Sequence, residues 1–264
     1  MTKKIVSLMY HDVVEAGQKR ASGFGSDDAD IYKLEDDLFN EHLNAIAERS
    51  KARLVTDYSG YSQQNENSVL ITFDDGGRGA FTHAANALER RGWRGHFFVA
   101  TDFIDTPTFL SRAEIKKLRA RGHIIGSHSA SHPLRFSSCT LKQMRAEWRE
   151  SIEKLADITG EKITIASVPG GHFSKAVAET AAESGIETLF NSEPVSSVYK
   201  IGNCRVLGRY SIRQKTTAAD AAALAVGALL PCSKQFLFWN AKKIAKRIGG
   251  EYYLDARRRI LSKR

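Results

Sequence analysis

Two acidic residues that directly follow an apolar run are the first residues in this sequence that could do chemistry. Asp74 and Asp75 come after residues 68–73, a β-branched run that predicts a buried strand, and two glycines follow them and force a turn. Burying two neighbouring carboxylates is costly without a partner, and a cation held between them would offset that cost. The alternative is that the pair only opens a turn, a position that Asp and Gly both favour.

Two histidines further along the chain could join these carboxylates. His128 and His132 are four residues apart, so in a helical turn both imidazoles would point to one side. Two imidazoles and one carboxylate make a catalytic metal site that leaves positions open for water and substrate. The residues between and before them are small, which leaves room for a ligand. The alternative is a structural pair of histidines that shares one surface of a helix.

Strands and helices alternate about seven times along the chain, which predicts a parallel α/β architecture. The length favours a barrel over an open sheet, and in such barrels the chemistry collects at the C-terminal ends of the strands. The polar clusters 10–12, 74–75, 128–132 and 169–171 all follow predicted strands. The predicted strands are 5–9, 68–73, 96–100, 123–126, 163–166, 187–190 and 205–212, and the predicted helices are 34–47, 80–91, 111–121, 140–160, 174–184 and 217–229.

Composition and charge limit the classes of protein to which this chain could belong. The chain has 264 residues and a net charge of +9, of which residues 241–264 contribute +7. We therefore expect a barrel domain over 1–230, with its motifs within about 65–230, and a basic helical extension over 231–264. The charge of this extension is typical of a solvated helical face, and the alternative is weak contact with an anionic membrane surface or an acidic partner. No recognised nucleic-acid motif accompanies the charge, so we expect no specific nucleic-acid partner.

The cysteines and the beginning of the sequence bear on location. Three widely spaced cysteines without a CxxC motif suggest a reducing compartment, and the first apolar run is too short for a secretory signal. These features predict a cytoplasmic protein that is peripheral at the inner membrane.

The motifs resemble those of a known family. Thr72-Phe73-Asp74-Asp75, the segment His128–His132 and the turn Pro169-Gly170-Gly171 are similar, in order and spacing, to the successive motifs of the polysaccharide deacetylases of carbohydrate esterase family 4, which share the NodB homology domain. The resemblance covers about residues 65–230. It implies a distorted (β/α)7-type barrel and a metal-dependent hydrolase that removes N-acetyl or other acyl groups from an amino sugar.

The resemblance also implies a role for each motif residue. Asp74 would be the general base, and Asp75, His128 and His132 would bind a divalent metal, with Zn expected and Co, Ni, Mn or Fe as alternatives. The backbone N–H of Gly170 would stabilise the oxyanion, within the turn that Pro169 and Gly171 complete. The implied substrate is an acetylated amino-sugar glycan or a lipid-linked sugar.

The sequence departs from the family pattern at two places. The third motif usually begins with an arginine that orients the base, and Ser167 stands there instead; Arg209, on another predicted strand, is the candidate replacement. The late motif that carries a histidine as general acid is not evident, which leaves His11 and His172 as candidates. These departures keep two alternatives open: a non-catalytic carbohydrate-binding or scaffold protein on the same fold, and an amidohydrolase acting on a cyclic amide that is not a sugar.

Overall fold

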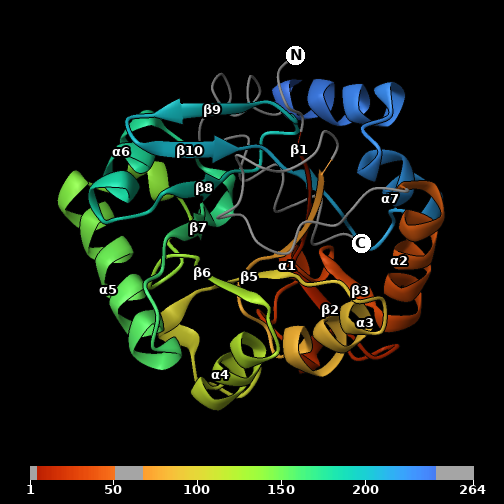
Figure 1. Ribbon diagram of the computed structural model, residues 1–264, viewed down its shortest axis with the longest axis horizontal. Coiled ribbons are helices and arrows are strands. Elements are labelled where there is room, and N and C mark those ends of the chain that lie inside the picture. Colours follow the sequence, from red (N-terminus) through yellow and green to blue (C-terminus); the bar gives the residue numbers. More distant parts are fainter. Residues whose placement is uncertain (1–4, 51–67, 242–264) are drawn as a thin grey trace.

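The computed structural model describes residues 5–50 and 68–241 and places one long sheet at its centre (Figure 1). The strands follow the order β11-β1-β4-β5-β6-β7-β8-β10-β9, and only the β9–β10 pair is antiparallel. Their bounds are β1 Ile5–Tyr10, β4 Ser68–Phe73, β5 His96–Val99, β6 Ile124–Ser127, β7 Ile165–Ser167, β8 Thr188–Phe190, β9 Val198–Ile201, β10 Cys204–Leu207 and β11 Tyr210–Ser211.

The helices lie around the outside of the sheet (Figure 1). They are α2 Asp36–Ser50, α3 Ala85–Glu89, α4 Arg112–Ala120, α5 Leu141–Thr159, α6 Lys175–Glu183 and α7 Ala218–Ala225, followed by a helix over Leu229–Ala241. A short helix α1 (Asp27–Asp30) and a two-stranded parallel sheet, β2 (Asp12–Val14) with β3 (Lys33–Glu35), lie near the end of β1.

The sheet is curled but open, because its strand order begins at β11 and ends at β9. The predicted α/β barrel class is therefore confirmed in the form of a curled half-barrel. Its core is formed by apolar side chains from the strands and from the inner faces of the helices, such as Leu8, Phe73, Phe97 and Leu155, all buried. This packing leaves the C-terminal ends of the parallel strands as one continuous edge.

One predicted strand is wrong in a way that matters for the site. The run 205–212 was expected to form a single strand, but it divides into β10, which pairs with β8, and β11, which pairs with β1. The break falls at Gly208 and Arg209, where a side chain on Gly208 would come within 2.3 Å of the Glu193 carbonyl oxygen. Arg209 therefore lies in the short connection between β10 and β11, two strands near opposite ends of the strand order.

Several other boundaries also differ from the prediction. The helix expected at 34–47 spans Asp36–Ser50, because Leu34 belongs to β3. The helix expected at 80–91 begins as a π-helical turn over Ala80–Ala84. The predicted domain boundary at 230 falls inside the helix Leu229–Ala241, and the division into two domains stays a prediction. The basic segment 242–264 lies outside the described residues.

Candidate active site

The two carboxylates after β4 point to different partners because the backbone turns sharply between them. Asp74 continues the sheet, with its N–H donating to the carbonyl of Tyr10 at 3.2 Å. Asp75 has a φ of 72°, in the left-handed region that few side chains adopt, and Gly76 follows at 84°. A side chain at Gly76 would lie 2.9 Å from Val99 Cγ1. Glycine there lets the turn pack against β5 and keeps the two carboxylates apart.

Asp12, the acid that ends the polar cluster 10–12, packs beneath this turn. Asp12 is buried, and a Cβ on Gly77 would lie 2.2 Å from Asp12 Oδ2. Asp12 Oδ1 accepts a hydrogen bond from the N–H of Val13 at 2.9 Å. Burial raises the pKa of Asp12 to about 7. Gly77, the second glycine after Asp75, therefore makes room for a buried carboxyl group that packs under the turn.

Asp74 is held by a buried arginine. Arg209 donates from both terminal nitrogens to the two Asp74 oxygens, at 2.6 and 2.7 Å. The Arg209 side chain is 0% exposed and that of Asp74 is 4% exposed. The remaining guanidinium donors reach the Asn191 carbonyl at 2.9 Å and the Thr72 hydroxyl at 3.1 Å. Such a two-pronged pair with further hydrogen bonds is the arrangement that makes a buried charge tolerable.

The charge of Asp74 follows from these contacts. Burial alone would raise the pKa of Asp74, but the positive charge of Arg209, the nearby His128 and the Arg209 hydrogen bonds outweigh burial and lower it. Asp74 is therefore a carboxylate at neutral pH, able to accept a proton.

Ser167, which occupies the position where the family pattern has an arginine, also contacts the base. Its hydroxyl donates to Asp74 Oδ1 at 3.0 Å and lies 2.5 Å from His128 Nδ1. The Ser167 carbonyl oxygen, which can only accept, is 3.1 Å from the same Nδ1. His128 therefore carries its proton on Nδ1, and the lone pair on Nε2 is free to bind a metal.

The second carboxylate faces both histidines. Asp75 Oδ1 is 3.4 Å from His128 Nε2 and 3.4 Å from His132 Nε2. One donor atom from each of the three residues lies within 4.8 Å of the others. Burial would raise the pKa of Asp75, but its close contacts with the two histidines hold it well below its usual range. The arrangement puts two nitrogens and one oxygen around a common point.

The segment that carries the histidines is not the helical turn that their spacing predicted. Ser129 and His132 both have positive φ, 65° and 54°, so residues 128–132 form a tight loop after β6. The carboxylate of Glu147, on α5, accepts from the N–H groups of Ala130 at 2.9 Å and Ser131 at 2.8 Å. The loop brings the imidazoles together by backbone strain and by this carboxylate rather than by helical periodicity.

The donor set fits a divalent metal. In tetrahedral zinc sites with bonds of about 2.0–2.1 Å, two ligand atoms lie about 3.3 Å apart. Both Asp75–histidine distances of 3.4 Å match that separation. Together with the Nδ1 proton of His128, which leaves Nε2 as a donor, this identifies Asp75, His128 and His132 as residues able to hold one ion.

The two candidate acids follow different strands of the sheet, His11 after β1 and His172 after β7. His11 follows β1, and its ring stacks on Tyr32 with 4.4 Å between centroids. Burial lowers the pKa of His11, although the Asp75 and Asp74 carboxylates act to raise it, so the imidazole is neutral at pH 7. His172 is half-buried at the end of the turn Pro169–Gly171. The influence of both carboxylates on the pKa of His11 places this residue beside the site.

The Pro-Gly-Gly turn packs against the end of the histidine loop. Gly170 has φ 62° and ψ 5°, and a side chain on it would lie 3.1 Å from the Leu134 carbonyl oxygen. The turn follows directly after β7, whose last residue is Ser167. The three motifs that the sequence singled out are thus brought to one edge of the sheet.

Sequence reasoning missed some residues that border the site. Phe24 contacts His132 with 5.0 Å between ring centroids, and Tyr32 contacts His11. Both come from the polar, glycine-containing loop 15–32, where no periodicity indicates which side chains turn inward. Glu147 lies beside Trp148 on a helix whose apolar spacing gave no sign of a loop contact.

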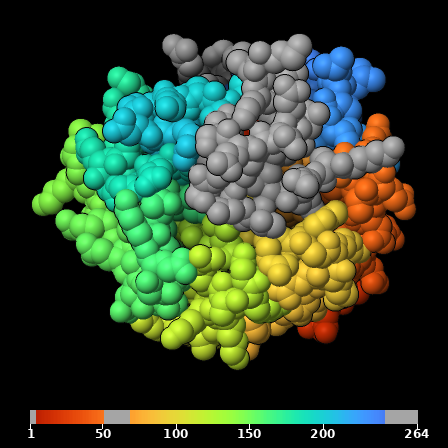
Figure 2. All heavy atoms as spheres, viewed as in Figure 1, coloured from red at the N-terminus to blue at the C-terminus, as the bar shows by residue number. Residues whose placement is uncertain are grey.

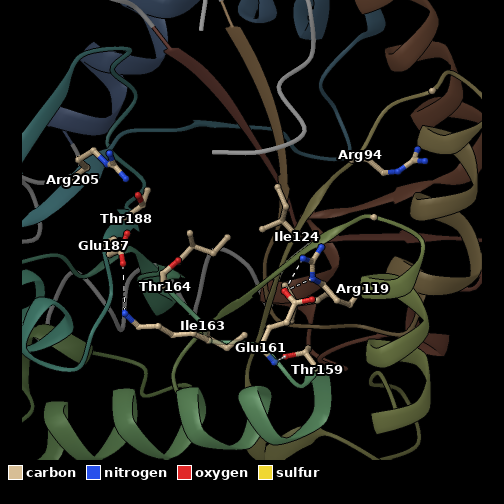
Figure 3. Close-up of a pocket in the computed structure, with 15 residues that line it drawn as sticks. Arg94, Arg119, Ile124, Thr159, Glu161, Ile163, Thr164, Glu187, Thr188 and Arg205 are labelled. Atoms are coloured by element: carbon tan, nitrogen blue, oxygen red, sulfur yellow. Dashed lines mark hydrogen bonds and ion pairs between the residues drawn. The ribbon is translucent and has the colours of Figure 1, made fainter. Parts of the chain in front are cut away.

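A cavity of about 620 Å³ lies at the opposite end of the sheet (Figure 3). It is lined by residues at or before the beginnings of β6, β7 and β8, such as Ile124, Ile165 and Thr188. Its wall holds two ion pairs: Arg119 with Glu161, which Figure 3 shows, and Lys162 with Glu187. No residue of the Asp–His cluster lines it, so this cavity is separate from the candidate active site.

Comparisons with known proteins agree with the motifs and the fold. Residues 61–189 match the family model described as polysaccharide deacetylase. The chain is 23% identical over 231 residues to the YxkH protein of Bacillus subtilis, covering 88% of this chain and 77% of the relative. It is 30% identical over 153 residues to the peptidoglycan-N-acetylmuramic acid deacetylase PdaA of the same organism, covering 57% of this chain and only 54% of PdaA.

A solved structure has the same fold. A polysaccharide deacetylase from Bacillus cereus superposes with a TM-score of 0.72 at 21% identity, covering 85% of this chain and 69% of that one. Residues 61–189 therefore match the polysaccharide deacetylase family, and the resemblance drawn from the motifs is confirmed.

Proposed function

We propose that this protein is a metal-dependent hydrolase that removes N-acetyl groups from an amino sugar in a glycan or glycan precursor. The observation that carries the proposal is the division of work between adjacent carboxylates: Asp74 is held ionised by Arg209, while Asp75 faces His128 and His132. The match of residues 61–189 to the polysaccharide deacetylase family supports the same reaction, as does the relative named for acting on peptidoglycan N-acetylmuramic acid.

Asp75, His128 and His132 would hold the metal. A divalent cation bound there would polarise the acetamide carbonyl and lower the pKa of a bound water. Two imidazoles and one carboxylate are a donor set typical of catalytic zinc, so zinc is the metal we propose, with cobalt, nickel, manganese or iron as the alternatives to test.

The remaining residues act on the proton and on the developing charge. Asp74 would accept the proton of the attacking water, and Arg209 with Ser167 fixes the direction of its oxygens. The backbone N–H of Gly170, in the turn begun by Pro169 and ended by Gly171, would donate to the oxyanion. His11, neutral at rest, would take up the proton that Asp74 accepts from the water and release it to the leaving amine.

The substrate and the location extend the proposal. We propose an acetylated amino-sugar glycan or a lipid-linked sugar as substrate, and a reducing, cytoplasmic location with weak contact between the basic segment and the inner membrane surface. The three free thiols, Cys139, Cys204 and Cys232, support a reducing location.

Metal binding by matched variants tests the site. The purified protein is stripped with a chelator and titrated with zinc, and free metal is followed with a competing dye. We expect one ion per chain, and an affinity at least about tenfold lower in Asp75→Ala and His128→Ala, because each removes a ligand. Asp74→Asn should keep the affinity yet lose about 10²–10⁴-fold of the activity. Asp157→Asn, on the surface of α5, is the control. Normal metal binding in Asp75→Ala and His128→Ala would refute the assignment.

The same variants separate the competing functions. Release of acetate from acetylated amino-sugar oligomers that disappears in Asp74→Asn is expected for the deacetylase. A non-catalytic binding protein would retain glycan affinity and show no turnover. An amidohydrolase that acts on cyclic amides would hydrolyse those compounds and leave the sugars intact. The contact between Arg209 and Asp74 argues against the non-catalytic alternative, because it replaces the orienting arginine whose absence motivated that alternative.

A further inference from the structure

The helix Leu229–Ala241 exposes an unusual number of large apolar side chains. Leu229 is 83% exposed, Leu230 86%, Leu237 67%, Phe238 54% and Phe236 44%. The helix lies at the rim of the molecule, beyond α7, and its blue atoms are at the upper right of Figure 2. Single exposed apolar residues are ordinary, but five on one helix form a contiguous patch of the kind that marks an interaction site.

The exposure is not the result of an undocked helix. The side-chain amide of Gln235 accepts from the N–H of Ser211 at 3.1 Å and donates to its carbonyl at 2.9 Å, so it replaces a partner strand at the β11 edge of the sheet. Cys232, one turn earlier, packs against the main core. These two residues define the inner face. Leu230 and Leu237, seven residues apart, share the opposite face.

The charge of the helix and of the sequence after it indicates which partner would bind this patch. Lys234 is the only charged residue of the helix, and the sequence that follows, 242–264, has nine basic residues and two acidic ones. An apolar helical face joined to a strongly cationic segment is the composition of helices that lie in the interface of anionic bilayers. A second copy of this chain would bring the same positive charge and be repelled. An acidic protein would not need five exposed leucine and phenylalanine side chains.

The helix can lie on a bilayer. Within the described residues, no single helix is long and apolar enough to cross one, although α7 and the Leu229–Ala241 helix together reach that length and composition across a 93° bend. The inner face of α7 is buried in the core, including Ala221, Ala222 and Leu224. Only the second helix of this pair has its apolar face available.

We propose that the helix Leu229–Ala241 is a docking element for the surface of an anionic lipid bilayer. Leu230 and Leu237 enter the boundary between headgroups and acyl chains, and the basic residues that follow contact the headgroups. Both the charge near such a surface and the apolar area removed from water favour binding. This inference concerns a surface that the proposed reaction does not use, and it goes beyond the weak contact expected from the basic segment alone.

Vesicle flotation with the full-length protein tests the proposal. We expect binding to vesicles that contain phosphatidylglycerol, little binding to pure phosphatidylcholine, and weakening by salt. The double variant Leu230→Glu, Leu237→Glu should reduce binding by at least about tenfold, since both side chains leave the acyl boundary. Leu141→Glu, at a half-exposed leucine at the start of α5, is the matched control and should bind normally. Thermal unfolding of each variant checks that the fold is intact.

Replacing Arg257, Arg258 and Arg259 by glutamine separates the contribution of charge from that of the apolar side chains. This variant should bind more weakly and with a smaller dependence on salt, because fewer headgroup contacts remain. Binding by the double leucine variant equal to that of the native chain would overturn the proposal, as would no binding of the native chain to anionic vesicles. A native dimer that the double variant converts to a monomer would also overturn it, because the patch would then be an interface between copies.

Discussion

The two ends of the curled sheet both carry arginine–carboxylate pairs, and the pairs differ mainly in burial. At the C-terminal ends of the strands, Arg209 lies 2.6 Å from Asp74, and their side chains are 0% and 4% exposed. At the other end, Arg119 lies 2.7 Å from Glu161, but the two side chains are 37% and 51% exposed. Nearly equal distances therefore correspond to different interaction energies. Water screens the exposed pair, whereas the buried pair lies in the lower dielectric of the protein interior. Burial, rather than contact, separates the candidate active site from the ordinary charged surface.

The largest effect is expected from removing the buried arginine. Arg209→Met should lower the free energy of unfolding by about 3–5 kcal/mol, because Asp74 would remain buried without a counter-charge. Urea denaturation measures this change. The double variant Arg209→Met, Asp74→Asn should recover part of the loss, since the unpaired charge is gone. A loss in the single variant no greater than that of Arg119→Met would break the comparison between the two ends.

The next effect is a pH dependence of stability from His123, which precedes β6 at the same end as the cavity. Its Nδ1 accepts from the Gly95 N–H at 3.1 Å, and its Nε2 lies 2.8 Å from Glu89 Oε1, so the neutral ring with its proton on Nε2 satisfies both contacts. Burial lowers the pKa of His123 from 6.5 to about 4, although Glu89 acts to raise it.

The sign of this dependence follows from proton uptake. Between pH 6.5 and about 4 the unfolded chain binds a proton at His123 that the folded chain does not, so the free energy of unfolding falls as the pH falls through this window. The expected loss in the free energy of unfolding reaches about 3 kcal/mol near pH 4, and there is no loss above pH 7. His123→Gln, which can make both hydrogen bonds without titrating, should flatten the curve of urea midpoint against pH. Equal slopes in the two proteins would contradict the assignment.

Local signals in the sequence predicted the elements well. The capping boxes Ser111–Glu114 and Thr140–Gln143 are present, because each needs only residues three apart. The motifs that end β4, β6 and β7 meet at one edge because parallel strands place their C-terminal ends together.

What could not be predicted depends on contacts far apart in the sequence. The spacing of His128 and His132 predicted a helical turn. The structure instead has a loop, which Glu147 on α5 and two residues with positive φ hold in place. The break at Gly208 likewise follows from close packing against Glu193, fifteen residues earlier. Neither contact has a local pattern that could have indicated it.

A smaller effect is expected at Ser167, which joins the two halves of the candidate site. Ser167→Ala removes a hydrogen bond to Asp74 and one to His128, and residues that support metal ligands in this way contribute about 10–100-fold to activity or metal affinity. Because Asp74 would lose a donor to its charged form, the acidic limb of the rate–pH profile should move to higher pH. Thr180→Val, which removes a buried hydroxyl from α6, is the control for loss of a hydroxyl alone. An unchanged pH profile and metal affinity in Ser167→Ala would show that the serine only fills space.

The smallest effect is expected at the exposed pair, and it completes the comparison. Arg119→Met should lower the free energy of unfolding by no more than about 1 kcal/mol, because the carboxylate of Glu161 regains water when its partner is lost. Added salt should shrink even this difference, since the Debye length falls to about 3 Å at 1 M. Metal affinity and deacetylation should not change, because the pair borders the cavity at the end of the sheet away from Asp75. A loss above about 2 kcal/mol, persisting in salt, would mean that an exposed pair at this end is as strongly coupled as a buried one, and burial could then no longer distinguish the two ends.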